Sequence, residues 1–234
     1  MCQEATLRPT ATSTFVALRT KAIVLVSGGI DSTVALWWVL NEGWEAIPLT
    51  IDYFARGKAE ESAVRRVVKK AGIRRLIEIP LDSVKEIHDL AKERRLPATI
   101  KRAPEGYIPA RNMMFYSIAS HYAEIEGAEF IVGGHNKGDP EEFPDSSQSF
   151  FRRMNDSMKM GLWSYRRKPV KILIPLRGKT KQEVIRLGFK LGAPLGLTWS
   201  CRFDRSKPCG KCSSCAERDE AFASIHAAAS VRRK

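Results

Sequence analysis

Several features that define whole classes of protein are missing from this sequence of 234 residues. No stretch approaches the roughly 20 consecutive apolar residues of a membrane-spanning helix, and residues 1–20 lack the apolar core of a secretory signal peptide. There is neither an internal repeat nor a low-complexity segment. We therefore expect a cytoplasmic globular protein with no membrane partner, in which residues 1–20 form a mobile N-terminal extension.

Cysteine is scarce outside one short segment. Of the five cysteines, one is Cys2 in the extension, and the other four lie within fifteen residues, at Cys201, Cys209, Cys212 and Cys215. Cytoplasmic thiols stay reduced, so a cluster of this kind indicates a metal rather than disulfides. Four thiolates with this knuckle-like spacing favour a closed, structural Zn²⁺ site. An iron–sulfur cluster is the alternative.

Acidic residues are outnumbered by basic ones, which gives a net charge of +13 and a pI near 9.7. Such a charge indicates polyanionic partners. The basic residues occur as scattered pairs, however, and we find no basic run with interleaved aromatics of the kind that lines a groove for single-stranded nucleic acid. Nucleic acid therefore stays open as a partner but is not favoured.

Short apolar segments alternate with amphipathic ones from Lys21 onward. The strands predicted from this pattern are 21–27, 45–51, 73–79, 130–133 and 170–174. The predicted helices are 31–41, a helix with Val64, Val67, Val68 and Ala71 on one face, 82–95, a helix with Phe115, Ile118, Ala119 and Tyr122, and a helix with Val184, Leu187, Gly188 and Leu191. A loop is expected over 97–109.

This alternation predicts an α/β fold, a doubly wound parallel sheet covered by helices on both faces. Ligands of such sheets bind beyond the carboxyl ends of the strands. We expect this domain to cover residues 21–196 and a small zinc-binding segment with a helix to cover residues 197–234.

A phosphate-binding loop is predicted where the first strand meets the first helix. Its residues are Val26, Ser27, Gly28, Gly29, Ile30, Asp31, Ser32 and Thr33. The two glycines allow a sharp turn that brings backbone N–H groups, hydroxyls and the helix N-terminus against an anion. Asp31 would repel a bare phosphate, so we interpret it as a ligand of Mg²⁺ that bridges phosphates. There is no GxxxxGK sequence, so cleavage of a terminal phosphate is not indicated.

The loop SGGIDS resembles the PP-loop of N-type ATP pyrophosphatases. Together with the cysteine cluster it resembles the 7-cyano-7-deazaguanine synthase family, over most of the chain from Lys21 to about Phe222. The marks of the resemblance are SGGIDSTVAL, the IDY at 51–53, the pair Arg111-Asn112, the IPL at 174–176, the LTWSC at 197–201 and the KPCGKCSSCAERDEAF at 207–222. The implied fold is of the adenine nucleotide alpha hydrolase-like, Rossmann-like type.

The resemblance implies an ATP-dependent carbon–nitrogen ligase. In that family the carboxylate of 7-carboxy-7-deazaguanine is adenylated, ammonia displaces AMP to give an amide, and a second ATP drives dehydration to the nitrile. The product serves queuosine or archaeosine formation in tRNA. The implied partners are thus a 7-deazapurine carboxylate and ammonia, the implied cofactors are ATP, Mg²⁺ and structural Zn²⁺, and the implied assembly is a homodimer.

Residue roles are predicted on the same basis. Asp31, Ser32 and Arg111 are expected to be catalytic, and ATP is expected to contact the phosphate loop, Asp52 and Tyr53. The predicted substrate contacts are Arg111, Asn112, His135, Asp139 and Asp145. The two acids are candidates because a guanine-like edge presents two donors, which call for a carboxylate acceptor.

Three loops depart from the family pattern. The family sequence DYGQRH is replaced at 52–57 by DYFARG, PGRN is replaced by PARN with Ala110, and YPDCRPEF is replaced at 143–150 by FPDSSQSF. These departures keep a second function open. It is a PP-loop relative that adenylates a related substrate and joins it to a different amine, or that modifies tRNA directly.

Overall fold

In the computed structural model of the protein, the described residues are 19–53, 57–81, 96–104, 107–203 and 205–231. Most of the predicted extension, the predicted helix 82–95 and residues 54–56 of the altered loop lie outside them. The strands are β1 (Lys21–Leu25), β2 (Glu45–Asp52), β3 (Ile77–Pro80), β4 (Phe130–Val132) and β5 (Lys171–Leu173). The helices are α1 (Ile30–Asn41), α2 (Lys58–Lys70), α4 (Ala98–Lys101), α5 (Arg111–Glu126), α6 (Asp139–Glu142), α7 (Gln148–Gly161), α8 (Lys181–Lys190) and α9 (Ser213–Val231), with 3-10 turns η2 (Pro144–Ser146) and η3 (Leu195–Leu197).

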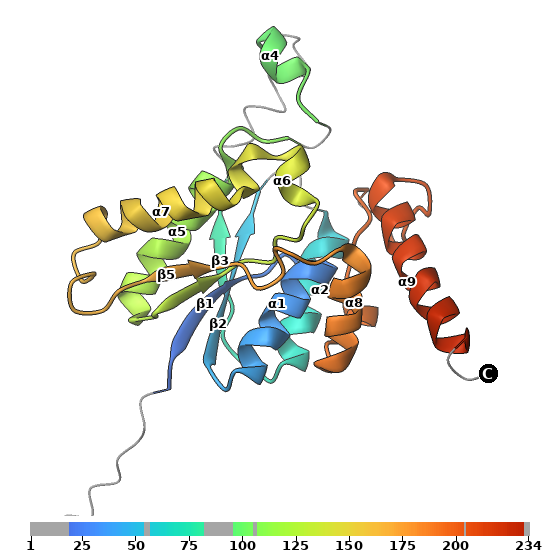
Figure 1. Cartoon of the computed structure of the whole chain (residues 1–234), viewed down its shortest axis with the longest axis horizontal. Helices are drawn as coiled ribbons and strands as arrows, with labels where there is room; N and C mark the ends of the chain where they lie inside the picture. The colour runs from blue at the N-terminus through green and yellow to red at the C-terminus, as the bar shows by residue number, and fades with distance from the viewer. Residues whose placement is uncertain (1–18, 54–56, 82–95, 105–106, 204, 232–234) are drawn as a thin grey trace, which may run out of the picture.

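The five strands form one sheet in the order β3-β2-β1-β4-β5, and every neighbouring pair is parallel. The chain builds outward from β1 through β2 to β3, then returns to place β4 on the other side of β1. Figure 1 shows α5 and α7 on one face of this sheet and α1, α2 and α8 on the other, with α9 beyond α8. The prediction of a doubly wound parallel sheet is therefore confirmed.

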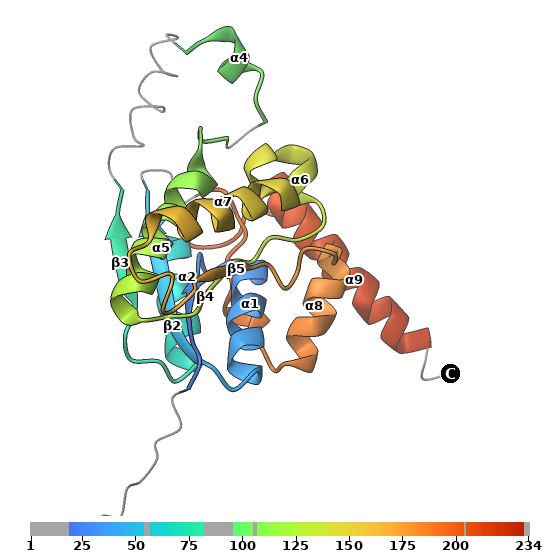
Figure 2. The ribbon, with the colours of Figure 1, turned by 60° about the vertical axis from the view of Figure 1, so that its left-hand side comes forward.

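Each face of the sheet carries its own hydrophobic core. Strand β1 shows why, because successive side chains along it enter opposite cores, and its three central residues are buried. Val24 packs with α1, α2 and α8 through Val34, Val67 and Val184. Ile23 packs on the other face with Tyr116 of α5 and with Phe151 and Met158 of α7, together with residues of neighbouring strands. Turned by 60°, Figure 2 again shows α5 and α7 apart from α1 and α8.

Strand β3 is shorter than predicted. It begins at Ile77, where pairing with Leu49 of β2 starts, and not at residue 73. Ile73 instead donates its N–H to Val68 and completes the end of α2, while Arg75 reaches Glu126 on α5 with a bidentate ion pair. The first residues of the predicted strand thus belong to the connection, because their backbone groups end the helix.

Helix α7 and the short α6 and η2 before it were not predicted, and the loop predicted over 97–109 contains α4. A signal for α7 was present: Ser147 accepts a hydrogen bond from Phe150 N as its N-cap, and the apolar residues that follow recur with helical spacing. On α5, Tyr116, Ala119 and Ala123 are fully buried, and of the predicted face Phe115, Ile118 and Tyr122 are partly buried against the same core. Among the residues that the structure describes, no helix combines the length and apolar character needed to cross a membrane.

Candidate active site

The phosphate loop is a fixed turn between β1 and α1. The N–H and the Oγ of Ser27 both lie 3.1 Å from Ser32 Oγ, which ties the two ends of the loop together. Gly28 has a φ of +84°, and a Cβ there would lie 2.8 Å from Val64 N on α2. Only glycine suits this position, because a side chain would be strained by the backbone angle and blocked by α2.

A cavity of about 300 Å³ lies at the carboxyl ends of the strands, beside the point where the strand order reverses. Of the predicted site residues, it brings together Val26, Ser27, Gly29, Asp31, Ser32, Tyr53, Arg111, Asn112, His135 and Asp139. Leu49, Ile51 and Phe115 give it an apolar wall next to the loop. The cavity is thus apolar beside β2 and polar toward α5 and the end of β4.

Gly134 sets how closely the end of β4 approaches the phosphate loop. A Cβ at this position would lie 2.7 Å from the carbonyl carbon of Asp31 and from the N of Ser32. Both are backbone atoms of the loop and cannot rotate away. Two chain segments far apart in sequence therefore meet here with no room for a side chain.

Lys181 lies against Asp31, although the sequence analysis did not identify it. Its Nζ is 2.6 Å from Asp31 Oδ2 and 3.7 Å from Glu217 Oε2. Burial opposes the charge of Lys181, but the carboxylate of Asp31, together with those of Glu217 and Asp139, outweighs that effect and raises the pKa of the lysine. The second oxygen, Asp31 Oδ1, is buried and has no hydrogen-bond partner among the described residues.

A second cavity of about 220 Å³ lies on the other side of the phosphate loop. Asp31 and Glu60 line both cavities, and Lys181 lines the second one. The C-terminal segment covers this side, because Trp199 donates its N–H to the carbonyl of Gly28 over 2.9 Å. The loop is therefore enclosed between the sheet and the segment that carries the cysteines.

The polar end of the first cavity is formed by residues that follow β4. Burial, with a smaller contribution from the charge of Arg111, lowers the pKa of His135 to about 4, so this imidazole is neutral at pH 7. Burial raises the pKa of Asp139 to about 6. The carboxylate also accepts a hydrogen bond from the N–H of Asn136, which lowers the pKa and only partly offsets the effect of burial. The hydroxyl of Tyr116, which was not predicted, is fully buried beside His135 and has no partner among the described residues.

Asp145, the first candidate for a carboxylate that contacts the substrate, lies outside both cavities, at the N-terminus of α5. Its carboxylate accepts the backbone N–H of Asn112 over 2.9 Å and the side-chain amide of Asn112 over 3.3 Å. It therefore stabilises the N-terminus of α5. The side chain of Asn112 also donates to Ser146 Oγ, so the altered loop at 143–150 is bonded to α5, and none of its residues lines either cavity.

One departure from the family pattern, alanine for glycine at position 110, falls where the backbone is left-handed. Ala110 precedes the first residue of α5 and has a φ of +53° and a ψ of +26°. It is the single non-glycine residue with positive φ in the described part of the chain. This left-handed conformation suits glycine, the residue of the family pattern, and is strained for alanine.

Four residues of the predicted ATP site stand outside the first cavity. Thr33 is fully buried and donates to the carbonyl of Gly29 over 2.8 Å, and Ile30 lines the second cavity only. Gly28 turns its carbonyl to Trp199, and the side chain of Asp52 is exposed at the end of β2. These residues support the loop or its surroundings in this structure.

The four clustered cysteines converge on one point. Their sulfurs all lie within 4.8 Å of one another, and those of Cys209 and Cys215 are 4.0 Å apart. Cys209 Sγ accepts the N–H groups of Lys211 and Cys212, which lower the pKa of its thiol to about 6. This arrangement can hold one metal ion, as predicted.

Comparison with known proteins decides the family. A family model described as queuosine biosynthesis protein QueC matches residues 21–226. The chain belongs to this family. A 7-cyano-7-deazaguanine synthase of Picrophilus torridus is 36% identical over 208 residues, which cover 87% of each chain. One from Nostoc punctiforme is 35% identical over 214 residues, covering 88% of this chain and 96% of that protein.

The fold extends beyond the QueC family. The structure of NMN synthetase from Francisella tularensis superimposes with a TM-score of 0.53 at 16% identity, and the match covers 82% of this chain and 71% of the other. This similarity bears on the fold alone. Lys181, Tyr116 and Glu60 were missed by the sequence analysis, and only Lys181 had a usable signal, since it opens a helix soon after the carboxyl end of a parallel strand.

Proposed function

We propose that the protein is an ATP-dependent ligase that converts 7-carboxy-7-deazaguanine and ammonia to 7-cyano-7-deazaguanine. The observation that carries the proposal is the meeting of the phosphate loop, Arg111 and His135 around one cavity in a chain of the QueC family. An oxygen of the substrate carboxylate attacks the α-phosphorus of ATP, and pyrophosphate leaves. Ammonia then attacks the acyl carbon and AMP leaves, which gives the amide.

The adenine of ATP is placed against the apolar wall beside β2. Ile51 and Tyr53 lie there, and Tyr53 packs at 5.8 Å from the ring of Phe115. The phosphates then reach the loop, where Ser27 and Ser32 supply hydroxyls and α1 supplies its N-terminus. Charge that develops on the leaving pyrophosphate is stabilised by these fixed donors and by Lys181.

The residues around Asp31 fit a magnesium ion. Asp31 Oδ1 is a buried carboxylate oxygen without a partner among the described residues, which is costly unless a cation or donor occupies the site in use. Mg²⁺ bound there supplies positive charge to the phosphate oxygens. The protein's own contribution is to hold the carboxylate of Asp31 in position, and Lys181 does this through its 2.6 Å contact with Asp31 Oδ2.

The acid substrate is placed toward α5. Arg111 is available to pair with its carboxylate, and its guanidinium also lies 5.5 Å from the ring centre of Phe143. Asp139 lines the cavity and takes the place first considered for Asp145 as acceptor of the donors on a guanine-like edge. His135 is neutral, so it offers one donor and one acceptor without adding charge beside Arg111.

We propose zinc as the metal of the cysteine cluster. A tetrahedral ion with metal–sulfur distances of about 2.3 Å holds its sulfurs about 3.8 Å apart, close to the 4.0 Å between Cys209 and Cys215. An iron–sulfur cluster places several metal ions between its cysteines and needs a wider spacing. Metal analysis of the purified protein tests this, and iron in place of zinc would contradict it.

The main experiment incubates the protein with ATP, Mg²⁺, ammonia and 7-carboxy-7-deazaguanine and follows AMP and products by mass spectrometry. We expect AMP, the amide and then the nitrile. Absence of AMP with this substrate would refute the proposal, and an amide that is never dehydrated would favour an arrested or diverted ligase. Arg111→Met should raise the KM for the acid at least about tenfold while changing the KM for ATP little.

Three further predictions belong to this proposal. The use of ammonia is tested by the same assay with ammonia withheld. The homodimer stays a prediction that the mass of the protein in solution would test, and the cytoplasmic location stays a prediction that cell fractionation would test.

A further inference from the structure

Trp163 is 98% exposed although the chain on both sides of it is fixed. Leu162 packs against the core on the α5 face, and Ser164 donates its N–H to the carboxylate of Glu124 over 2.7 Å. The N–H groups of Arg167 and Lys168 both donate to the carbonyl of Ser164, which closes a compact turn. The turn therefore holds the indole in solvent, where a large apolar side chain is costly without a partner.

The chain segment that carries this tryptophan is rich in basic residues. The segment 148–169 contains six Lys and Arg residues but a single acidic residue, Asp156. The six are exposed and form no ion pair with any residue that the structure describes. We call Trp163, the exposed Met160 and the six basic residues the Trp163 patch; the six are Arg152, Arg153, Lys159, Arg166, Arg167 and Lys168.

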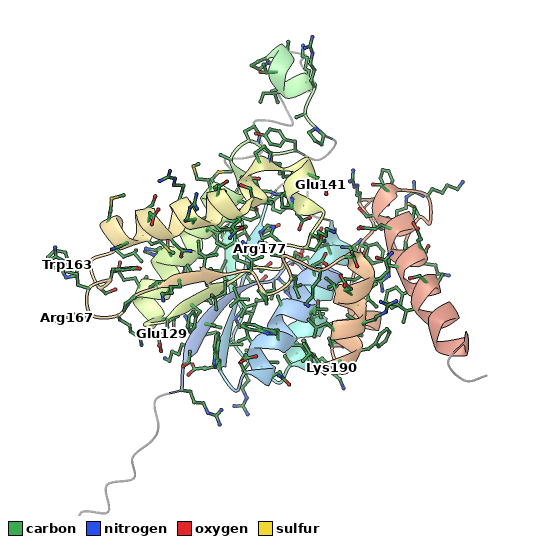
Figure 3. The ribbon with its side chains drawn as sticks, in the orientation of Figure 1. Glu129, Glu141, Trp163, Arg167, Arg177 and Lys190 are labelled. Atoms are coloured by element: carbon green, nitrogen blue, oxygen red, sulfur yellow. The ribbon has the colours of Figure 1, made fainter. Side chains whose placement is uncertain are left out.

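The patch lies away from the active site. Figure 3 shows Trp163 and Arg167 together on the turn after α7, at the end of the molecule opposite α9. None of the patch residues lines either cavity beside the phosphate loop. Its role is therefore independent of the proposed ligase reaction.

We propose that the Trp163 patch binds single-stranded RNA. An exposed indole offers a face on which a base can stack, and the arginine and lysine side chains of the same turn and of α7 can bind the phosphates along the strand. Four of the six basic residues are arginines, whose planar guanidinium pairs with phosphate through two hydrogen bonds. In the sequence, Trp163 and Tyr165 come directly before two arginines and a lysine, a combination that the sequence analysis did not single out.

Other occupants fit the patch less well. A second copy of the chain in a symmetric dimer would bring two uncompensated basic clusters together, which is unfavourable. A membrane surface would find two exposed apolar side chains, Met160 and Trp163, whereas interfacial segments bury a broad apolar face. RNA supplies both the negative charge and the stacking partner.

The test measures binding of a fluorescein-labelled single-stranded RNA of about 12 nucleotides by fluorescence anisotropy at several salt concentrations. Trp163→Ala carries no charge change, and we expect it to weaken binding roughly 5- to 150-fold. Trp163→Phe should restore much of the affinity because it keeps an aromatic face. The double change Arg166→Ala with Arg167→Ala should weaken binding and lower the slope of log Kd against log salt by about 1.4, because each phosphate that an arginine neutralises contributes about 0.7 to that slope.

The matched control is Lys69→Ala with Lys70→Ala on α2, which removes the same charge where the structure shows no exposed aromatic residue beside it. Equal weakening by this control, or wild-type affinity in Trp163→Ala, would overturn the proposal. So would Trp163-dependent binding to vesicles with anionic lipids in the absence of RNA binding, or a Trp163-dependent dimer in light scattering. AMP formation by Trp163→Ala should equal that of the wild type, so a failed RNA result leaves the ligase proposal untouched.

Discussion

The two ends of the active-site cavity are built in different ways. In the proposed reaction, the phosphate loop acts through backbone N–H groups, two serine hydroxyls and a helix N-terminus, all fixed within a few consecutive residues. The proposed acceptor end uses the side chains of Arg111, His135 and Asp139, which line the same cavity and come from different elements. The loop is held by the sheet and by the covering segment at Trp199, whereas the acceptor end depends on the way α5 and the segment after β4 pack together.

This difference shows which changes each end tolerates. A phosphate loop that binds through its backbone fails when the backbone moves, so its glycines and their neighbours are critical. The loop at 143–150 departs from the family pattern outside the cavity lining, since its residues bond to α5 and α7 and none of them lines either cavity.

The largest effect on activity is expected from substitution of Asp31, the charged residue of the phosphate loop. Asp31→Ala removes the carboxylate that holds Lys181 and the proposed Mg²⁺, and we expect AMP formation to fall at least about 100- to 1000-fold. Asp31→Asn keeps the size of the side chain and should lose nearly as much. Circular dichroism should show a folded protein in both variants, and turnover near the wild-type rate would contradict the role given to Asp31.

A purely geometric change should come next. Gly134→Ala would place a Cβ 2.7 Å from the backbone of Asp31 and Ser32, so the loop must shift. We expect AMP formation to fall about 10- to 100-fold and the free energy of unfolding to fall by about 1–3 kcal/mol. Gly178→Ala is the control, because a Cβ there meets nothing within 4 Å. If both variants behave alike, close packing at Gly134 is not what fixes the loop.

The two buried titratable groups of the acceptor end, Asp139 and His135, should make the stability of the protein depend on pH. The raised pKa of Asp139, about 6, stabilises the folded state below the ordinary value near 4, and this contribution is lost as the pH rises to 6. The lowered pKa of His135, about 4, works in the opposite direction, because its contribution is lost as the pH falls from about 6.5. In the wild type the two trends oppose each other between about pH 4 and 6.

Removing either group should expose the other trend. Between about pH 4 and 6, the free energy of unfolding of Asp139→Asn should increase by about 1–3 kcal/mol more than that of the wild type. In His135→Phe the free energy of unfolding should decrease over the same range. Urea unfolding at several pH values measures both slopes. Slopes that match the wild type in both variants would show that these two side chains do not titrate as their burial implies.

The smallest effect is expected beside Arg111. Ala110→Gly relieves a left-handed alanine and should stabilise the protein by about 0.5–1 kcal/mol. Gly72→Ala is the converse case, since Gly72 has a φ of +73° with open space around it, and it should destabilise by about 1 kcal/mol. Thermal unfolding checks both. A destabilising Ala110→Gly would mean that the strain at this position is balanced by contacts of the alanine side chain.

The contrast between the two ends also explains how far the sequence could be read. The phosphate loop and the cysteine cluster were predictable because their parts are close together in the chain and their spacing carries the chemistry. The hydrogen bond between Asp145 and Asn112 could not be predicted, because the two residues lie 33 positions apart and sequence spacing does not show such a contact. Lys181 escaped notice for the same reason, since it meets Asp31 across 150 residues.

The sequence by itself determined the fold class, the position of the phosphate loop, the four clustered cysteines and the resemblance to the family. Each of these depends on local periodicity or short spacing, which the chain carries directly. Tertiary structure alone decided that Asp31 meets Lys181, that Gly134 presses on the loop, that Asp145 caps α5 and that Trp163 stands in solvent. These depend on which distant segments the sheet brings together, and on the space left between them when the core packs.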